Sequence, residues 1–125
     1  NKYTATTQIT LGYASGTNVF SETDLEGTKI AVKASSATVY MYDLDNAANA
    51  AASFFKAWNA ASGDVTVGTT APDVIILIPA STRLQVPVPA GQVFGTALTV
   101  ACVTAAGTAG TTNPTSSVIV RIVYA

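Results

Sequence analysis

One apolar run constrains the fold of this chain more than any other feature. Residues Val74 to Ile78 are all large and apolar, and Pro79 ends the run. The run is long enough for a strand and too short for an ordinary helix, and most of its side chains are β-branched. Because both faces of such a strand are apolar, we expect it to be fully buried inside a β-domain.

The composition and net charge of the chain argue against several classes of protein. The chain has 125 residues, of which 49% are hydrophobic and 10% charged, so it is long enough for one domain with a real core. The net charge is −1 and the six Lys and Arg residues are dispersed, which argues against a nucleic-acid partner. No apolar run approaches the ~20 residues of a membrane span, and no basic-then-apolar signal segment opens the chain. So few charges favour a surface partly covered by partner subunits.

Short apolar or alternating segments recur along the chain, with Gly, Pro or Asn between them. We expect strands at residues 9–13, 29–33, 38–44, 52–59, 74–78, 83–89, 93–94, 98–103 and 117–124. Alternating residues of 38–44 place apolar groups on both faces, which predicts a strand covered on both sides. Residues 83–89 carry Pro87 and Pro89, which cannot donate ladder hydrogen bonds, so they form an edge strand. The final strand, which is largely apolar, belongs inside a sheet. The pattern predicts an all-β, antiparallel β-sandwich of jelly-roll or Greek-key type.

Two segments allow more than one interpretation. Residues 46–52 are rich in Ala and Asn and suit a capped helix, but the β-character of their neighbours favours a loop followed by a strand at 52–59. Residues 1–28 are polar and rich in Thr, and they are either an ordinary first strand with a loop or an extended arm that reaches a neighbouring subunit. The division expected is therefore an N-terminal arm or first strand at 1–28 and a β-sandwich domain at 29–125.

Catalytic and metal-binding motifs are weak. The chain has no histidine, which removes the usual bases and the commonest zinc ligand. Ser53 and Lys56 match the S-x-x-K pattern of serine acyl-enzymes, but the supporting motifs are absent. Asp43, Asp45 and Asn46 offer oxygen atoms without calcium-loop spacing. Cys102 is the only cysteine, so no intrachain disulfide forms. We expect no enzyme activity, no catalytic residue, no metal and no cofactor.

From Ile30 to Ala125 the chain resembles a domain that recurs in the virion proteins of tailed bacteriophages. The pieces that carry the resemblance keep their order: Val32-Lys-Ala-Ser-Ser-Ala, Ala51-Ala-Ser-Phe-Phe-Lys-Ala-Trp-Asn, Val67-Gly-Thr-Thr-Ala-Pro, Val74-Ile-Ile-Leu-Ile-Pro-Ala, Val88-Pro-Ala-Gly, Val103-Thr-Ala-Ala-Gly-Thr-Ala and Val120-Arg-Ile-Val-Tyr-Ala. The chain departs from the family pattern at Phe54 and Trp58, where Tyr is more usual, and by the short segment in front.

The resemblance implies a structural protein on the capsid surface of a phage virion. Such domains look like capsid decoration (cement) proteins, often homotrimers, whose partner is the major capsid protein. The alternative is the receptor- or glycan-binding tip of a phage fibre or of a head or tail appendage.

A set of apolar and aromatic residues is predicted to contact partners. Four lie in the arm and three on the strand at 52–59, where ordinary burial is the competing interpretation: Tyr3, Ile9, Leu11, Phe20, Phe54, Lys56 and Trp58.

Overall fold

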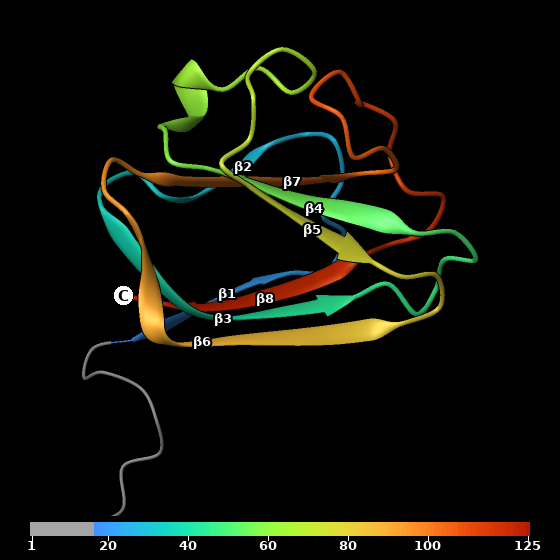
Figure 1. The fold of residues 1–125 in the computed structure, drawn as a ribbon, viewed down its shortest axis with the longest axis horizontal. Coiled ribbons are helices and arrows are strands. Elements are labelled where there is room, and N and C mark those ends of the chain that lie inside the picture. Colours follow the sequence, from blue (N-terminus) through green and yellow to red (C-terminus); the bar gives the residue numbers. More distant parts are fainter. Residues whose placement is uncertain (1–16) are drawn as a thin grey trace, which may run out of the picture.

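Short strands joined by turns dominate the computed structural model, which describes residues 17–125 (Figure 1). In this part of the chain the strands are β1 (Asn18–Glu22), β2 (Ile30–Lys33), β3 (Ala37–Asp45), β4 (Ser53–Trp58), β5 (Val74–Ile78), β6 (Arg83–Phe94), β7 (Leu98–Val103) and β8 (Ile119–Tyr124). One turn of 3₁₀ helix, η1 (Ser62–Asp64), interrupts the connection from β4 to β5. Among residues 17–125, no helix has the length and apolar character that crossing a membrane requires.

The strands form two antiparallel sheets that pack face to face. Sheet A has the order β1-β8-β3-β6 and sheet B the order β2-β7-β4-β5. Strands pair from the two ends of this series inwards, β1 with β8, β2 with β7, β3 with β6 and β4 with β5. This is the strand order of a jelly roll, a long hairpin rolled into two sheets. The predicted all-β antiparallel sandwich is confirmed.

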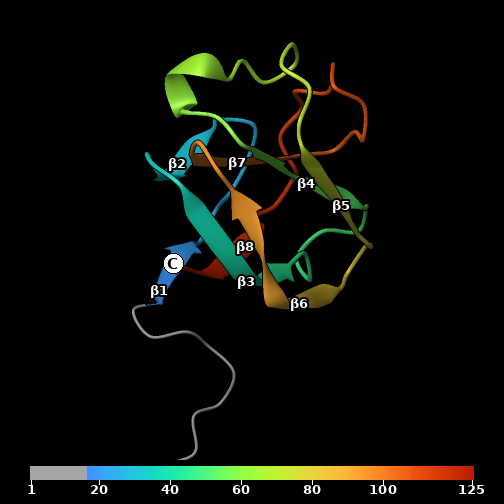
Figure 2. The ribbon, with the colours of Figure 1, turned by 60° about the vertical axis from the view of Figure 1, so that its left-hand side comes forward.

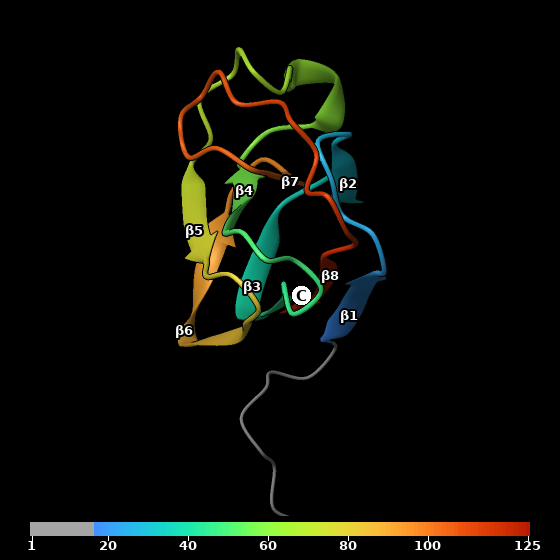
Figure 3. The same ribbon diagram turned by 90° about the vertical axis from the view of Figure 1, so that its right-hand side faces the viewer.

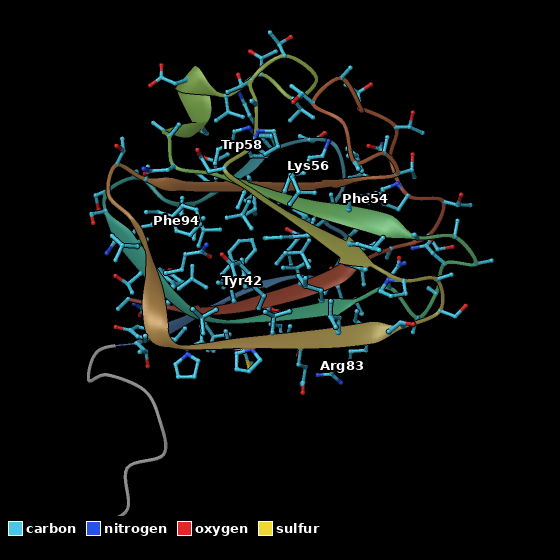
Figure 4. The ribbon with its side chains drawn as sticks, viewed as in Figure 1. Tyr42, Phe54, Lys56, Trp58, Arg83 and Phe94 are labelled. Atoms are coloured by element: carbon cyan, nitrogen blue, oxygen red, sulfur yellow. The ribbon has the colours of Figure 1, made fainter. Side chains whose placement is uncertain are left out.

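Large apolar side chains from both sheets fill the space between them. Tyr42 of β3 and Phe55 of β4 meet edge to face, with ring centroids 5.3 Å apart, and Phe94 closes one end (Figure 4). Each such side chain contributes roughly 1.5–3 kcal/mol when it is fully buried. These contacts hold the two sheets together, and the inner faces carry most of the buried apolar residues of the sandwich.

Several expectations hold at the level of single strands. The bounds of β5 and β7 are those expected for residues 74–78 and 98–103. Residues 46–52 contain turns and no helix, and β4 follows them, so the loop-then-strand interpretation is correct. Strand β8 lies inside sheet A, between β1 and β3, and β6 is an edge strand, both as expected.

The expectation that residues 74–78 are fully buried is wrong. Strand β5 is the edge of sheet B, and the side chains of Ile75 and Leu77 are 46% and 52% exposed. Only the inward-facing side chains of β5, such as Ile78, join the core. The apolar run identifies a strand, but the position of that strand within the sheet depends on which other strands pair with its two edges.

Irregular backbone changes two other strands. A register shift between Val39 and Met41 breaks the alternation expected for residues 38–44, so Val39 and Tyr42 both face the core. Residues 83–89 and 93–94, expected as two strands, form the single strand β6, which bends where its pairing with β3 passes from Pro87 to Gln92, and its last part rises toward the other sheet (Figure 1). Gly91 has φ = +81°, and a Cβ there would lie 2.6 Å from Thr38 Cγ2, so the bend requires glycine.

The first described strand is part of the sandwich. Strand β1 pairs with β8, and Leu25 is completely buried in the core. Any free arm can therefore comprise only the residues before β1, because residues 18–25 belong to the domain. The strand expected at residues 9–13 lies outside the described residues.

Candidate interaction surface

The outer face of sheet B, which points away from the core, is apolar. We call it the outer apolar face; it is formed by Phe54, Lys56, Trp58, Ile75, Leu77, Ala101 and Val103. The strand register places Lys56 between Ile75 of β5 and Ala101 of β7, and Phe54 between Leu77 and Val103. Side chains that lie opposite each other on neighbouring strands contact each other, so this face forms one continuous surface.

Two loops of the chain cover half of this face. The loop at residues 59–73 folds over Trp58, which is 1% exposed and packs with Val65 and Ala101. The indole Nε1–H donates to the carbonyl oxygen of Thr70 at 3.0 Å, and the Thr99 hydroxyl donates to the carbonyl oxygen of Ala60 at 2.8 Å. Figure 4 shows Trp58 directly beneath this loop. The covered half is thus a second, smaller core.

Lys56 ties the second loop to the sheet. Its side chain is 1% exposed, and its Nζ donates to the carbonyl oxygen of Gly107, in the loop at residues 104–118, at 2.6 Å. Burial lowers the pKa of the Lys56 ammonium below its usual value of 10.5. The contact satisfies a buried charge and a loop carbonyl, so its role in the described fold is structural.

The other half of the outer apolar face is bare. Phe54 is half-buried, and Ile75 and Leu77 beside it are the exposed large hydrophobic residues of β5. We call these three residues the bare patch. They lie at the edge of the sheet, next to the free side of β5, which two views place at the boundary of the molecule (Figures 2 and 3). Apolar side chains and free strand edges both favour association with another chain.

A pocket of about 270 Å³ lies at the start of β4. Residues 48–53 line one side, and residues 104 and 114–116 line the other. Its wall is fixed by a polar cluster in which Asn49 Nδ2 and the Ser53 hydroxyl donate to Asn46 Oδ1 at 2.8 and 2.9 Å. Asn49 also accepts from the backbone N–H of Ser116 at 2.7 Å. The hydrogen bonds of these side chains hold the two loops together.

The geometry separates Ser53 from Lys56. They stand three positions apart on β4, and successive strand residues point to opposite faces. Ser53 donates to Asn46, while Lys56 lies on the outer apolar face beneath the loop at residues 104–118. The S-x-x-K pattern therefore forms no serine–lysine pair in this fold.

The oxygen atoms considered for a metal do not converge either. Asp43 receives two hydrogen bonds from Arg83, from Nε at 3.0 Å and from Nη2 at 2.7 Å, and this contact lowers the pKa of the Asp43 carboxyl. Asp45 accepts from the N–H of Ala47, and Asn46 points into the polar cluster. Within residues 17–125 no group of three His, Cys, Asp or Glu residues has the arrangement of a metal site.

Cys102 lies in the core, on the inner face of β7 opposite Phe55. Burial raises the pKa of its thiol to about 12, so the reactive thiolate is disfavoured at neutral pH. Its role is that of a small apolar side chain.

The residues predicted to contact partners are not gathered in one place. Tyr3, Ile9 and Leu11 lie outside the described residues, and Phe20 packs against the core from β1. Lys56 and Trp58 are covered by the loops, which leaves Phe54 as the member of the set at the bare patch.

Sequence reasoning missed the exposed apolar residues of the described chain, which are Val19, Ile75, Leu77 and Val93. For Val19 and Val93 the signal was a following Phe that packs inward, Phe20 or Phe94, because neighbouring strand residues point to opposite faces. Ile75 and Leu77 gave no such signal, because they stand in a continuous apolar run.

Comparisons of the chain with protein families, with curated proteins and with solved structures find no match.

Proposed function

We propose that this protein is a structural component of a tailed-bacteriophage particle, a decoration protein that binds and stabilises the assembled head shell. The observation that carries the proposal is the bare patch, an apolar surface at a free sheet edge, on a sandwich whose buried polar side chains all have partners within the described residues. Such a surface suits binding to other protein subunits better than it suits chemistry.

Two further points support this function. The jelly roll recurs in viral capsid proteins and in lectins, which is an analogy at the level of fold. The ordered sequence pieces from Ile30 to Ala125 resemble those of phage virion domains, which are often homotrimers that bind the major capsid protein. Together they favour an assembly role over a catalytic one.

The mechanism we propose is mass action. A protein that binds the assembled shell and not its separated subunits stabilises the shell by RT ln(1 + [L]/Kd), which is about 2.7 kcal/mol per site when the free protein stands at one hundred times its Kd. The bare patch, with Phe54, Ile75 and Leu77, supplies apolar contact area, and the residues before β1 supply additional reach.

The test is binding of the purified protein to phage capsids that lack it. We expect it to sediment with assembled capsids, to raise the temperature at which they break open, and to remain apart from free capsid subunits. Electron cryo-microscopy should place it at repeated sites on the head. Capsids whose thermal stability is unchanged at saturating protein, or sites confined to the tail, would contradict the proposal.

A deletion defines the contribution of the arm. Removal of residues 1–16 keeps β1 and Leu25, so the domain should fold and capsid binding should weaken if the arm docks. A longer deletion, to residue 28, would remove β1 and a core residue, and its loss of binding would say nothing about docking.

The pocket beside the polar cluster favours a second candidate function, a receptor- or glycan-binding tip on a fibre or appendage. Small side chains line it, half of them alanines and a proline and half of them Asn, Ser and Thr, and lectins share the jelly-roll architecture. Glycan-array binding that is lost in a Thr115→Tyr variant, which would fill the pocket, supports this function. An array without hits, together with labelling of the head, removes it.

A further inference from the structure

The four edge strands of the described sandwich are β1, β6, β2 and β5, and they differ in how they are protected from pairing with another chain. Strand β6 carries Pro87 and Pro89, β1 ends at Glu22, and β2 carries Lys33 beside a register shift. Prolines, charges and irregular pairing are the usual devices that block an edge. Strand β5 has none of them, since its five residues are all large and apolar.

We propose that the free edge of β5 pairs with β5 of a second copy of this chain. The two strands run antiparallel about a two-fold axis perpendicular to the sheet, centred on Ile76. This register pairs all five residues, with Val74 opposite Ile78 and Ile75 opposite Leu77 of the other copy. The two four-stranded B sheets then become one sheet of eight strands.

The proposed pairing brings exposed apolar side chains of the two copies together on the outward face of the sheet. A two-fold axis perpendicular to the sheet keeps outward residues on the outward side, so Ile75 and Leu77, which are 46% and 52% exposed, meet their counterparts across the axis. The contact extends the bare patch into one apolar surface shared by two copies, beside Phe54 of each.

Electrostatics also permits the pair. No charged residue lies in β5, so no like charges face each other along the strand. The nearest charge in sequence, Asp73, comes opposite Pro79 of the other copy and donates its own backbone N–H to Ala57 within its own chain. An isologous contact fails when it places a charge against itself, and this register avoids that.

The contact is short. Five paired residues span about 17 Å, well below the extent of an obligate dimer interface, so the affinity is modest and association depends on concentration. A two-fold contact is additional to any three-fold assembly, and neighbouring copies held at high local concentration would form it most fully. It does not depend on the proposed function, because it is a property of the free protein.

Analytical ultracentrifugation of the full chain from micromolar to millimolar concentration tests the pairing. We expect a reversible monomer–dimer equilibrium. Leu77→Lys should weaken it about tenfold, since it replaces the apolar contact with Ile75 of the other copy by a charged side chain on both sides of the axis. The matched control is Val93→Lys, which adds the same charge at a residue 69% exposed on another edge strand and should dimerise as the parent chain does.

Cysteine cross-linking tests the register. Ile75→Cys and Leu77→Cys variants, mixed and oxidised, should form the mixed disulfide dimer, and each variant alone should cross-link several-fold less, because opposite residues meet within disulfide reach and diagonal ones do not. Cys102 is buried and does not compete.

A chain that stays monomeric at millimolar concentration overturns the proposal. So does equal weakening by both lysine variants, or cross-linking of each cysteine variant with itself as readily as in the mixture. Dimers that persist in Leu77→Lys but vanish when residues 1–16 are removed would also overturn it, and would assign the contact to the N-terminal segment instead. Capsid binding is measured separately, so failure here leaves the proposed function standing.

Discussion

The two outward faces of this sandwich differ in exposed charge, although both carry apolar residues, such as Val19 and Val123 on sheet A. On sheet A, Asp43 of β3 is nearly buried, pairs with Arg121 of β8 and binds Arg83 of β6, and both of these arginines are exposed to solvent. On sheet B, the corresponding positions form the outer apolar face, of which loops cover one half. Only the first of these faces is ordinary for an antiparallel sheet, which usually buries one side and exposes the other.

The difference between the two outward faces explains the role of the two long loops. Residues 59–73 and 104–118 contain many Gly, Thr and Ala residues and look dispensable, yet their backbone carbonyls accept the hydrogen bonds of Trp58 and Lys56. Polar groups that would be costly to bury alone become partners for one another. The covered half therefore belongs to the stability of the domain, and the bare patch remains for contacts outside it.

The largest effect is expected for Trp58, at the centre of the covered half. Trp58→Ala removes a buried indole, leaves the Thr70 carbonyl without its donor and opens a cavity beneath residues 59–73. We expect a loss of about 3–5 kcal/mol in the free energy of unfolding, measured by urea denaturation.

Phe54→Ala is the matched control for Trp58, since it removes an aromatic ring from the same strand and face at a half-buried position. Its cost should be about 1–2 kcal/mol, well below that of Trp58→Ala. Equal losses for the two variants would mean that the loops do not form a second core.

Substitution of Lys56 should give the next largest loss in the free energy of unfolding. Two variants separate the contribution of its charge from that of its aliphatic chain. Lys56→Ala leaves the Gly107 carbonyl without a donor and a void under the loop, so it should cost about 1–3 kcal/mol. Lys56→Met keeps the stem and removes the buried charge, so its stability should lie within about 1 kcal/mol of the parent at pH 7. Greater damage from Met than from Ala would contradict a packing role.

The pH dependence of this pair has a definite sign. Because burial lowers the pKa of Lys56 in the folded state, the unfolded chain binds more protons between that lowered pKa and 10.5. The stability of the parent relative to Lys56→Met should therefore rise with pH through that window. Cys102 titrates in the same range with the opposite sign, since its raised pKa favours unfolding above pH 9, and its charge is coupled to that of Lys56, so the two proteins are compared below pH 9.

A smaller effect is expected on the polar face of sheet A. Asp43→Asn weakens the contact with Arg83, whose side chain is 51% exposed, so the loss at pH 7 should be at most about 1 kcal/mol. The folded-state pKa of Asp43 is lowered, so its contribution is present above pH 3.8 and is lost as the pH falls through the folded-state value. Acid titrations followed by circular dichroism should converge for parent and variant at low pH. A gap that stays constant on acidification would show that the carboxylate charge is not involved.

The sequence predicted strands better than it predicted their neighbours. Apolar runs closed by Pro79 or by turn residues set the bounds of β5 and β7, and the prolines at 87 and 89 placed β6 at an edge. The edge position of β5 was not predictable, because a continuous apolar run is the same signal in a buried strand and in one with an exposed apolar side. The register shift at Met41 also left no signature, as both faces of β3 carry apolar residues.

The candidate surface was predictable only in part. The aromatic and lysine pattern of β4 identified the right strand and the right face, but not that Trp58 and Lys56 are covered while Phe54 is bare. That division depends on where residues 59–73 and 104–118 lie, and small residues in loops give no periodic signal. The bare patch itself became visible only when the sheet order placed β5 beside β4 and left its other side free.

The smallest effect on stability is expected at the bare patch, and it completes the contrast between the two halves of the outer apolar face. Leu77→Thr keeps a strand-forming residue at a position that is 52% exposed, so the free energy of unfolding should change by less than about 0.5 kcal/mol. Ile78→Thr, one residue further along β5 and fully buried, should cost about 2 kcal/mol or more, because it places a hydroxyl in the core. Self-association of the full chain should show the opposite order. Leu77→Thr should weaken self-association while leaving the fold intact, and Ile78→Thr should act on stability more than on self-association. If Leu77→Thr instead destabilises the monomer as much as Ile78→Thr does, then the exposed side chains of the bare patch contribute to the stability of the domain and not to association with a partner.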